Sequence, residues 1–304
     1  DGTLWIFGGQ GFAEGKVAGL LNDLWKRDAT TGLWTWVSGS NGMNAKANYG
    51  AQGLSEDTNQ PGARSGAVSW LDQDGTLWMF GGNGFDETSA KAGALNDLWS
   101  FDPNSLEWTW WKGSSIVNVN GTYGVKGASS STSTPGARQG ATAWVDGENT
   151  LWLFGGLGQP GTGTASGPLN DLWKYIPAEN TWTWVSGESG LNAVGVYGEL
   201  GGISSVANPG ARSFASGWVD HDGLLYLYGG NGLGAAPRTV GLLNDLWVYY
   251  PESNRWSWIK GSPALGAPTV SGLLGVTNPS NVPSGRAGSM TWITGNQEVW
   301  MFGG

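Results

Sequence analysis

Short apolar runs that alternate with polar residues, separated by Gly and Pro, follow one another along the whole chain. The run Glu107–Trp111 places Trp, Thr and Trp in turn, and the run Thr76–Phe80 is apolar on both faces and leads into two glycines. A period of two is typical of a β-strand, whereas a helix would place its apolar residues three and four positions apart. Together with Ser65–Trp70 and Asp97–Phe101, these runs predict a unit of four antiparallel strands.

This four-stranded unit recurs with a period of 74 residues. The sequence Leu-Asn-Asp-Leu-Trp begins at residues 21, 95, 169 and 243. A fixed period is the signature of a repeat architecture. Between the first and second strands, Asp74-Gly75 predicts a type I′ hairpin turn. The predicted fold class is all-β, in a single repeat region over residues 1–304. Its units fall at about residues 1–37, 64–111, 138–185, 212–259 and 286–304.

The strands of a unit differ in composition in a way that predicts a β-propeller. The first strand is built from Gly, Ala and Ser, which suit a crowded position near an axis, and the second is apolar on both faces. The markers Phe80-Gly81-Gly82, Trp99 and Trp108 resemble the Kelch repeat, and the resemblance covers the whole chain. It implies propeller blades of four antiparallel strands. The period exceeds the roughly 50 residues of an ordinary Kelch unit, and the surplus lies in the loops.

The predicted strands do not fill a whole number of blades. The chain opens with the second to fourth strands of a unit and ends with the first and second strands of another. Both ends therefore supply a second strand, and the two compete for one position in a closed ring. We expect a segment of a larger propeller or array; the alternative is a four-bladed ring with one displaced strand.

Composition and charge remove several classes of function. A net charge of −9 argues against binding to duplex nucleic acid, which requires a cationic surface. The chain has no Cys and one His, which argues against thiol chemistry, thiolate zinc and multi-His metal sites. Its apolar runs are far shorter than the roughly 20 residues that span a bilayer. We expect no cofactor, no metal, no nucleic-acid partner and no membrane insertion.

Two connections in each unit are long, those between strands two and three and between strands four and one. Both are predicted to lie on one face, where we place ligand binding. Repeated Tyr and Asn residues in these loops could form a polar-aromatic platform for a sugar or a peptide. Alternatively they are structural, with Asn bonding backbone and Tyr packing on the blade. The candidate ligand-binding residues, including loop residues that break the repeat, are Tyr49, Tyr123, Tyr197, Asn44, Asn118, Asn192, Lys46, Asp57, Lys126 and Arg238.

One Asp and one Arg also recur in every unit. An active site is a single asymmetric arrangement, whereas these charges form equivalent copies. We interpret them as ion pairs or backbone anchors, because buried charges persist only when paired. The recurring Trp residues are likewise interpreted as core. The repeated charged positions are Asp23, Asp97, Asp171, Asp245, Arg64, Arg138, Arg212 and Arg286.

Three functions are compatible with these patterns. The first is a non-catalytic binding or adhesion module, extracellular or on the cell surface, that recognises a glycan or a protein through the long loops. The second is a structural protein whose copies assemble head to tail into a filament or surface layer. The third is a carbohydrate-active enzyme on a propeller scaffold. No carboxylate pair stands out in the sequence, so the expectation is that the chain is not an enzyme.

Overall fold

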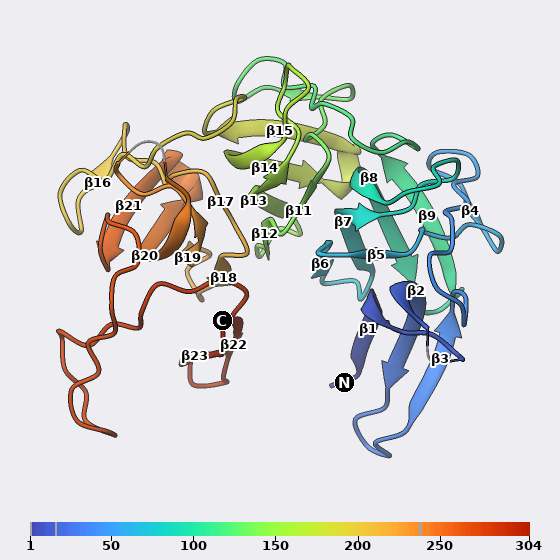
Figure 1. The fold of residues 1–304 in the computed structure, drawn as a ribbon, viewed down its shortest axis with the longest axis horizontal. Helices are drawn as coiled ribbons and strands as arrows, with labels where there is room; N and C mark the ends of the chain where they lie inside the picture. The colour runs from blue at the N-terminus through green and yellow to red at the C-terminus, as the bar shows by residue number, and fades with distance from the viewer. Residues whose placement is uncertain (1, 16, 237–238) are drawn as a thin grey trace. The chain divides into compact units, whose positions relative to one another are not determined.

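The computed structural model describes residues 2–15, 17–236 and 239–304, and these residues fold into antiparallel sheets (Figure 1). The only helical turns among them are two 3-10 turns, η1 (Pro177–Glu179) and η2 (Pro251–Ser253). The all-β prediction is therefore confirmed. The chain divides into two units, Asp1–Gly121 with Thr134–Gln139, and Thr122–Ser133 with Gly140–Gly304.

The first unit contains the N-terminal sheet and the second sheet. The N-terminal sheet has three strands in the order β1-β2-β3, and the second sheet has the order β4-β9-β8-β7-β5, with β6 also paired to β7. The strand β11 (Arg138–Gln139) also belongs to this unit. The strands are β1 (Leu4–Phe12), β2 (Ala18–Arg27), β3 (Trp34–Ser38), β4 (Ser55–Glu56), β5 (Arg64–Ser65), β6 (Val68–Leu71), β7 (Leu77–Gly84), β8 (Gly93–Asp102) and β9 (Glu107–Lys112).

The second unit contains the third sheet, the fourth sheet and the C-terminal hairpin. In the third sheet, β10, β15, β14 and β13 follow in order, and β12 pairs with β13; the fourth sheet repeats this order with β16, β21, β20, β19 and β17, and β18 pairs with β19. The strands are β10 (Ser129–Ser130), β12 (Thr142–Val145), β13 (Leu151–Gly158), β14 (Gly167–Ile176), β15 (Thr181–Ser186), β16 (Ile203–Ser204), β17 (Arg212–Ser213), β18 (Ser216–Val219), β19 (Leu225–Gly232), β20 (Gly241–Tyr250), β21 (Arg255–Lys260), β22 (Met290–Ile293) and β23 (Val299–Phe302).

In four copies of the repeat, the second strand continues beyond its pair of glycines instead of ending there; these strands are β1, β7, β13 and β19. In β7 the pairing with β8 shifts register between Phe80 and Gly82, which is a β-bulge. Gly81 has a φ of 67°, and a Cβ on it would lie 2.7 Å from the carbonyl oxygen of Arg138. The glycine pair therefore permits the bulge, and the strand carries on to Gly84.

The turn between β6 and β7 is not the predicted type I′ turn. A type I′ turn at Asp74-Gly75 needs a positive φ at both residues, and only Gly75 has one, at 83°. The amide of Gly75 instead donates to the carbonyl of Asp72, which makes Gln73 and Asp74 the central residues. The Asp72 carboxylate accepts the amides of Asp74 and Thr76 and fixes this wider turn.

The long connection after the fourth strand belongs to the sheet that follows it. The segment after β3 pairs with β9 as β4, with Ser55 opposite Thr109, and then supplies β5 on the other side of the second sheet. An antiparallel β-bridge between Asn48 and Gln60 closes the loop that contains β4. These connections are therefore part of the sheets. They leave less unpaired loop for recognition than the sequence suggested.

Large aromatic rings fill the sheets. Trp99, Trp173 and Trp247 are fully buried on the third strands, and Trp173 meets Trp182 edge to face at 6.3 Å. Edge-to-face pairs of this kind add stability beyond the area that they bury. The recurring Trp residues are thus buried or half-buried in the complete sheets. Within the described ranges, no helix is long and apolar enough to cross a membrane.

Candidate functional site

The recurring charges form a buried network inside each complete sheet. Arg64 binds Asp97 through two hydrogen bonds, from Nη1 to Oδ1 and from Nη2 to Oδ2, both of 2.7 Å. Its remaining donors reach the carbonyl oxygens of Gly62 and Gly81. The same arrangement joins Arg212 to Asp245 at 2.6 and 2.8 Å in the fourth sheet. The Arg therefore pairs with the Asp that lies 33 residues further along the chain.

Each of these carboxylates also accepts hydrogen bonds from a Tyr hydroxyl and from a Trp indole N–H. Asp97 accepts the hydroxyl of Tyr49 at 2.9 Å and Nε1 of Trp99 at 2.8 Å. Burial is the largest single influence on the pKa of Arg64 and lowers it, but the charge of Asp97, the hydrogen bonds to it and the interaction with Tyr49 together raise that pKa above its ordinary value. Burial, followed by the charge of Asp97, raises the pKa of Tyr49. The polar atoms of the network are thus committed to the fold.

The Tyr–Asp hydrogen bond is repeated in the two other complete sheets. The Asp and Arg copies nearest the two ends of the chain have different partners. Tyr123 donates to Asp171 at 2.6 Å and Tyr197 to Asp245 at 2.7 Å. Arg138 is buried and donates from Nε to the carbonyl of Gly136. In the described part of the N-terminal sheet, Asp23 accepts only Nε1 of Trp25, at 2.6 Å. Near the other end, the described partners of Arg286 are Ser284 and the carbonyl of Gly303.

The candidate Tyr and Asn residues make contacts within the fold. The three Tyr rings are buried and pack on Trp99, Trp173 and Trp247 at 4.9 to 5.1 Å. Asn44, Asn118 and Asn192 adopt left-handed φ values of 57 to 61°. The side-chain oxygens of Asn44 and Asn118 accept the amides of Leu20 and Ala94. The buried Tyr rings leave little surface for a ligand, whereas the three Asn side chains are exposed, and their role in binding stays a prediction.

The two irregular Lys candidates bind backbone carbonyls of their own units. Lys46 donates to the carbonyl of Thr88, and Lys126 donates to the carbonyl of Gly187 while lying 4.4 Å over the Trp184 ring. Asp57 is exposed. Arg238 lies outside the described residues.

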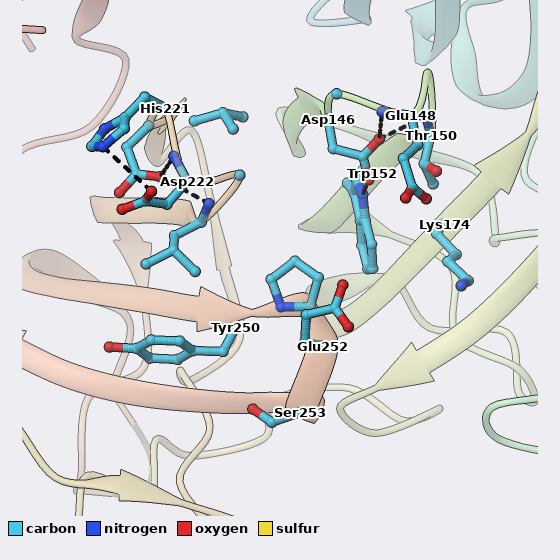
Figure 2. Close-up of a pocket in the computed structure, with 16 residues that line it drawn as sticks. Asp146, Glu148, Thr150, Trp152, Lys174, His221, Asp222, Tyr250, Glu252 and Ser253 are labelled. Carbon is cyan, nitrogen blue, oxygen red and sulfur yellow. Dashed lines mark hydrogen bonds and ion pairs between the residues drawn. The ribbon is translucent and has the colours of Figure 1, made fainter.

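A different surface of the second unit forms a hollow of about 710 Å³. The turn that follows β12 lies across it from the turn that follows β18, and the end of β20 with η2 closes its floor (Figure 2). These are the short turns, so this hollow lies at the opposite ends of the strands from the long loops where binding was expected. We call this surface the acidic hollow; its charged lining residues are Asp146, Glu148, Lys174, Asp220, His221, Asp222 and Glu252.

Two of the carboxylates hold the walls of the acidic hollow in place. Asp146 accepts the amides of Glu148 and Thr150 and, at 2.7 Å, Nε1 of Trp152. Asp220 does the same for the facing turn and accepts the hydroxyl of Tyr226 at 3.1 Å. Burial, then the charge of Asp220, raises the pKa of Tyr226 to about 12, so this hydroxyl remains a donor at neutral pH.

The remaining charges of the acidic hollow are exposed or partly exposed. Glu148 and Glu252 are exposed, and no described residue pairs with either carboxylate. Asp222 lies 3.3 Å from Nε2 of His221. Lys174 lies 5.9 Å from the centre of the Trp152 ring, which lines the same space. The site combines a carboxylate excess with aromatic surface, which suits a cation.

Sequence reasoning missed the acidic hollow, although part of its signal is present. Asp72, Asp146 and Asp220 recur at the 74-residue period directly before the hairpin turns. That recurrence could have identified the turn-building carboxylates. Glu148 and Glu252 follow no repeat, and only the packing of two neighbouring sheets brings them to one hollow.

Comparison with known proteins identifies the repeat. A family model described as the KLHDC2/KLHL20/DRC7 Kelch-repeats domain matches residues 54–304. The human "Multiple epidermal growth factor-like domains protein 8" is 30% identical over 173 residues, which is 50% of this chain, and the rat protein is 31% identical over 137 residues, which is 44%. The chain spans only 5% and 4% of the length of these relatives.

A solved structure also shares the fold. YjhT matches with a TM-score of 0.52 and 16% identity, covering 100% of this chain and 82% of YjhT. At this identity the likeness shows the fold alone. The resemblance read from the blade markers is confirmed by these matches.

The match to YjhT also corrects the expectation that this chain is not an enzyme. That expectation rested on the lack of a recognisable catalytic motif. A fold by itself does not decide whether a protein is catalytic, because activity depends on the residues placed on it. The expectation was wrong, and the exclusion of enzymatic activity is withdrawn.

Proposed function

Because this chain belongs to the Kelch-repeat family, we propose that it is a protein-binding module, extracellular or on the cell surface, whose acidic hollow receives a cationic segment of its partner. Kelch domains are generally protein-binding modules. The observation that carries the proposal is the pair of carboxylates, Glu148 and Glu252, that line a 710 Å³ hollow beside an aromatic wall without a cationic partner among the described residues.

The chemistry of the hollow favours a Lys or Arg side chain over a sugar. A guanidinium or ammonium group can bind the carboxylates through charge-assisted hydrogen bonds and lie against Trp152 or Tyr250. The chain as a whole has a net charge of −9, which speeds encounter with a basic partner. The same carboxylates would repel an anionic glycan.

The relatives support the proposed location. Their name states that they contain epidermal growth factor-like domains. Such domains are small disulfide-dense modules that form in oxidising, extracellular environments. We therefore infer that this chain acts outside the cell or on its surface.

The test is binding of immobilised synthetic peptides that contain two Lys or Arg residues, compared with peptides in which these are Gln. We expect the basic peptides to bind and the double variant Glu148→Gln with Glu252→Gln to bind them at least about 10-fold more weakly. The matched control is Glu87→Gln with Glu179→Gln, two carboxylates outside the acidic hollow. Equal binding of the Gln peptides, unchanged binding by the double variant, or binding of a glycan array alone would contradict the proposal.

A further inference from the structure

The floor of the acidic hollow is a turn that the second unit contains twice. Tyr250 precedes η2 in the fourth sheet, and Ile176 precedes η1 at the equivalent position of the third sheet. The backbone φ and ψ are −104° and 99° at Tyr250 and −106° and 105° at Ile176. Both turns begin with Pro and end at an Asn in the left-handed region, Asn180 with a φ of 52° and Asn254 with a φ of 51°. The two turns therefore share one backbone conformation.

Side chains hold both turns in the same way. The Tyr249 hydroxyl donates to Oδ1 of Asn254 at 3.0 Å, and the Tyr175 hydroxyl donates to Oδ1 of Asn180 at 2.9 Å. Asn254 also donates from Nδ2 to the carbonyl of Val185 at 3.4 Å. The floor is therefore fixed by the fold, and side chains that it carries are positioned before a partner arrives.

The two turns differ in the pair of side chains that η2 presents to the acidic hollow. Tyr250 and Glu252 line the hollow, whereas the third sheet has Ile176 and Ala178 at the equivalent positions. Since the same turn forms with Ile and Ala, its conformation requires neither the Tyr nor the Glu. The fold therefore does not account for these two residues, and recognition can.

The Tyr250 ring is the aromatic surface of the hollow that is left for a cation from a partner. The Trp152 ring already has Nζ of Lys174 at 5.9 Å from its centre. No described residue places a cation over the half-buried Tyr250 ring or forms a hydrogen bond with its hydroxyl. Glu252 lies two residues further along the same floor, and Asp222 belongs to the turn after β18 that forms one wall (Figure 2).

An aromatic face beside carboxylates distinguishes arginine from lysine. A guanidinium group is planar, so it can lie flat on a ring while the N–H groups around its edge donate to carboxylates. It is also weakly hydrated, so covering one of its faces removes little favourable hydration. The ammonium group of Lys is a compact and strongly hydrated point charge without a flat face. It can pair with the carboxylates, but it gains less from the ring.

We propose that the acidic hollow selects arginine over lysine, and that Tyr250 is the residue that determines this selectivity. The guanidinium group of the partner lies on the Tyr250 ring and donates to the Glu252 carboxylate, while Asp222 adds negative charge from the wall. The inference rests on the proposed function, because it names the side chain through which the basic segment of the partner is recognised.

The test titrates the full chain with two synthetic peptides that are identical except that every basic position is Arg in one and Lys in the other. We expect the wild type to bind the Arg peptide about 5-fold more tightly. Tyr250→Ile should weaken binding of the Arg peptide by about 5-fold and binding of the Lys peptide by less than about 2-fold. This variant should fold, because the same turn already forms with Ile176 in the third sheet.

Further variants separate the ring from the charge. Tyr250→Phe keeps the ring and should keep the preference for Arg, whereas Glu252→Ala removes a charge that both peptides use and should weaken both. The matched control is Glu179→Ser, which gives η1 the residue of η2 outside the hollow and should change neither affinity. Equal binding of the two peptides by the wild type, or a preference that survives in Tyr250→Ile, overturns the inference and leaves the proposed function standing. If neither peptide binds, the proposed function is wrong and the inference falls with it.

Discussion

At the scale of single residues, the repeated Asp, Arg and Tyr side chains form contacts within the fold, and we propose that Glu148 and Glu252, which follow no repeat, bind the partner. The sequence located the Asp and Arg positions and predicted that they act as ion pairs or anchors. It could not show which Asp meets which Arg, because Arg64 and Asp97 are joined only by the pairing of strands around them. It also offered Tyr49 and Tyr197 as ligand contacts, since a Tyr in a long loop gives no sign that its ring is buried.

The hydroxyl of Tyr197 provides a test of this structural role. Replacing Tyr197 by Phe removes the 2.7 Å hydrogen bond to Asp245 and leaves the ring in place. A hydrogen bond to a charged group contributes about 1.5–3 kcal/mol, so we expect the free energy of unfolding to fall by about 2 kcal/mol in urea denaturation. The control is Tyr250→Phe, whose hydroxyl has no hydrogen-bond partner among the described residues. If Tyr197→Phe weakens ligand binding at unchanged stability, the residue is a ligand contact after all.

At the scale of elements, the sequence predicted the existence of the strands better than their ends. The Gly-Gly pair was predicted to end a strand. Instead β7, β13 and β19 continue past it, with a β-bulge at the glycines. The long connections read as recognition loops, yet they pair with the next sheet as β4, β10 and β16. These pairings join residues about 50 positions apart, and short two-residue strands carry too little periodicity to reveal them.

One glycine at the end of each fourth strand is expected to be required for the sheet to close. Gly187 has a φ of 80°, and a Cβ there would overlap the carbonyl oxygen of Asn170. Gly187→Ala should lower the free energy of unfolding by at least about 2 kcal/mol, since it adds a backbone clash to the roughly 1–2 kcal/mol of a left-handed conformation.

Gly198→Ala is the matched control for the clash. Gly198 also has a positive φ, of 65°, but a Cβ there would meet no atom within 4 Å. It should therefore lose only the conformational part of the free energy, about 1 kcal/mol. Equal losses in the two variants, measured by thermal or urea unfolding, would show that the steric argument is wrong.

At the scale of the whole molecule, the fixed 74-residue period is the most informative feature of the sequence. It predicted the repeated sheets, because a unit copied in constant register folds in the same way each time. Trp173 and Trp247, at the same position of two repeats, are accordingly both fully buried. The acidic hollow was not predictable in this way, since it arises where side chains of two sheets meet.

Salt should weaken the proposed binding of a basic segment at the acidic hollow. Peptide binding at the acidic hollow depends on exposed carboxylates such as Glu148 and Glu252, and raising salt from about 0.1 M to about 1 M shortens the Debye length from about 10 Å to about 3 Å. We expect the affinity for basic peptides to fall by more than about 10-fold over this range. An affinity that changes by less than about 3-fold over the same range, measured by peptide titration, would show that the exposed carboxylates do not drive the binding.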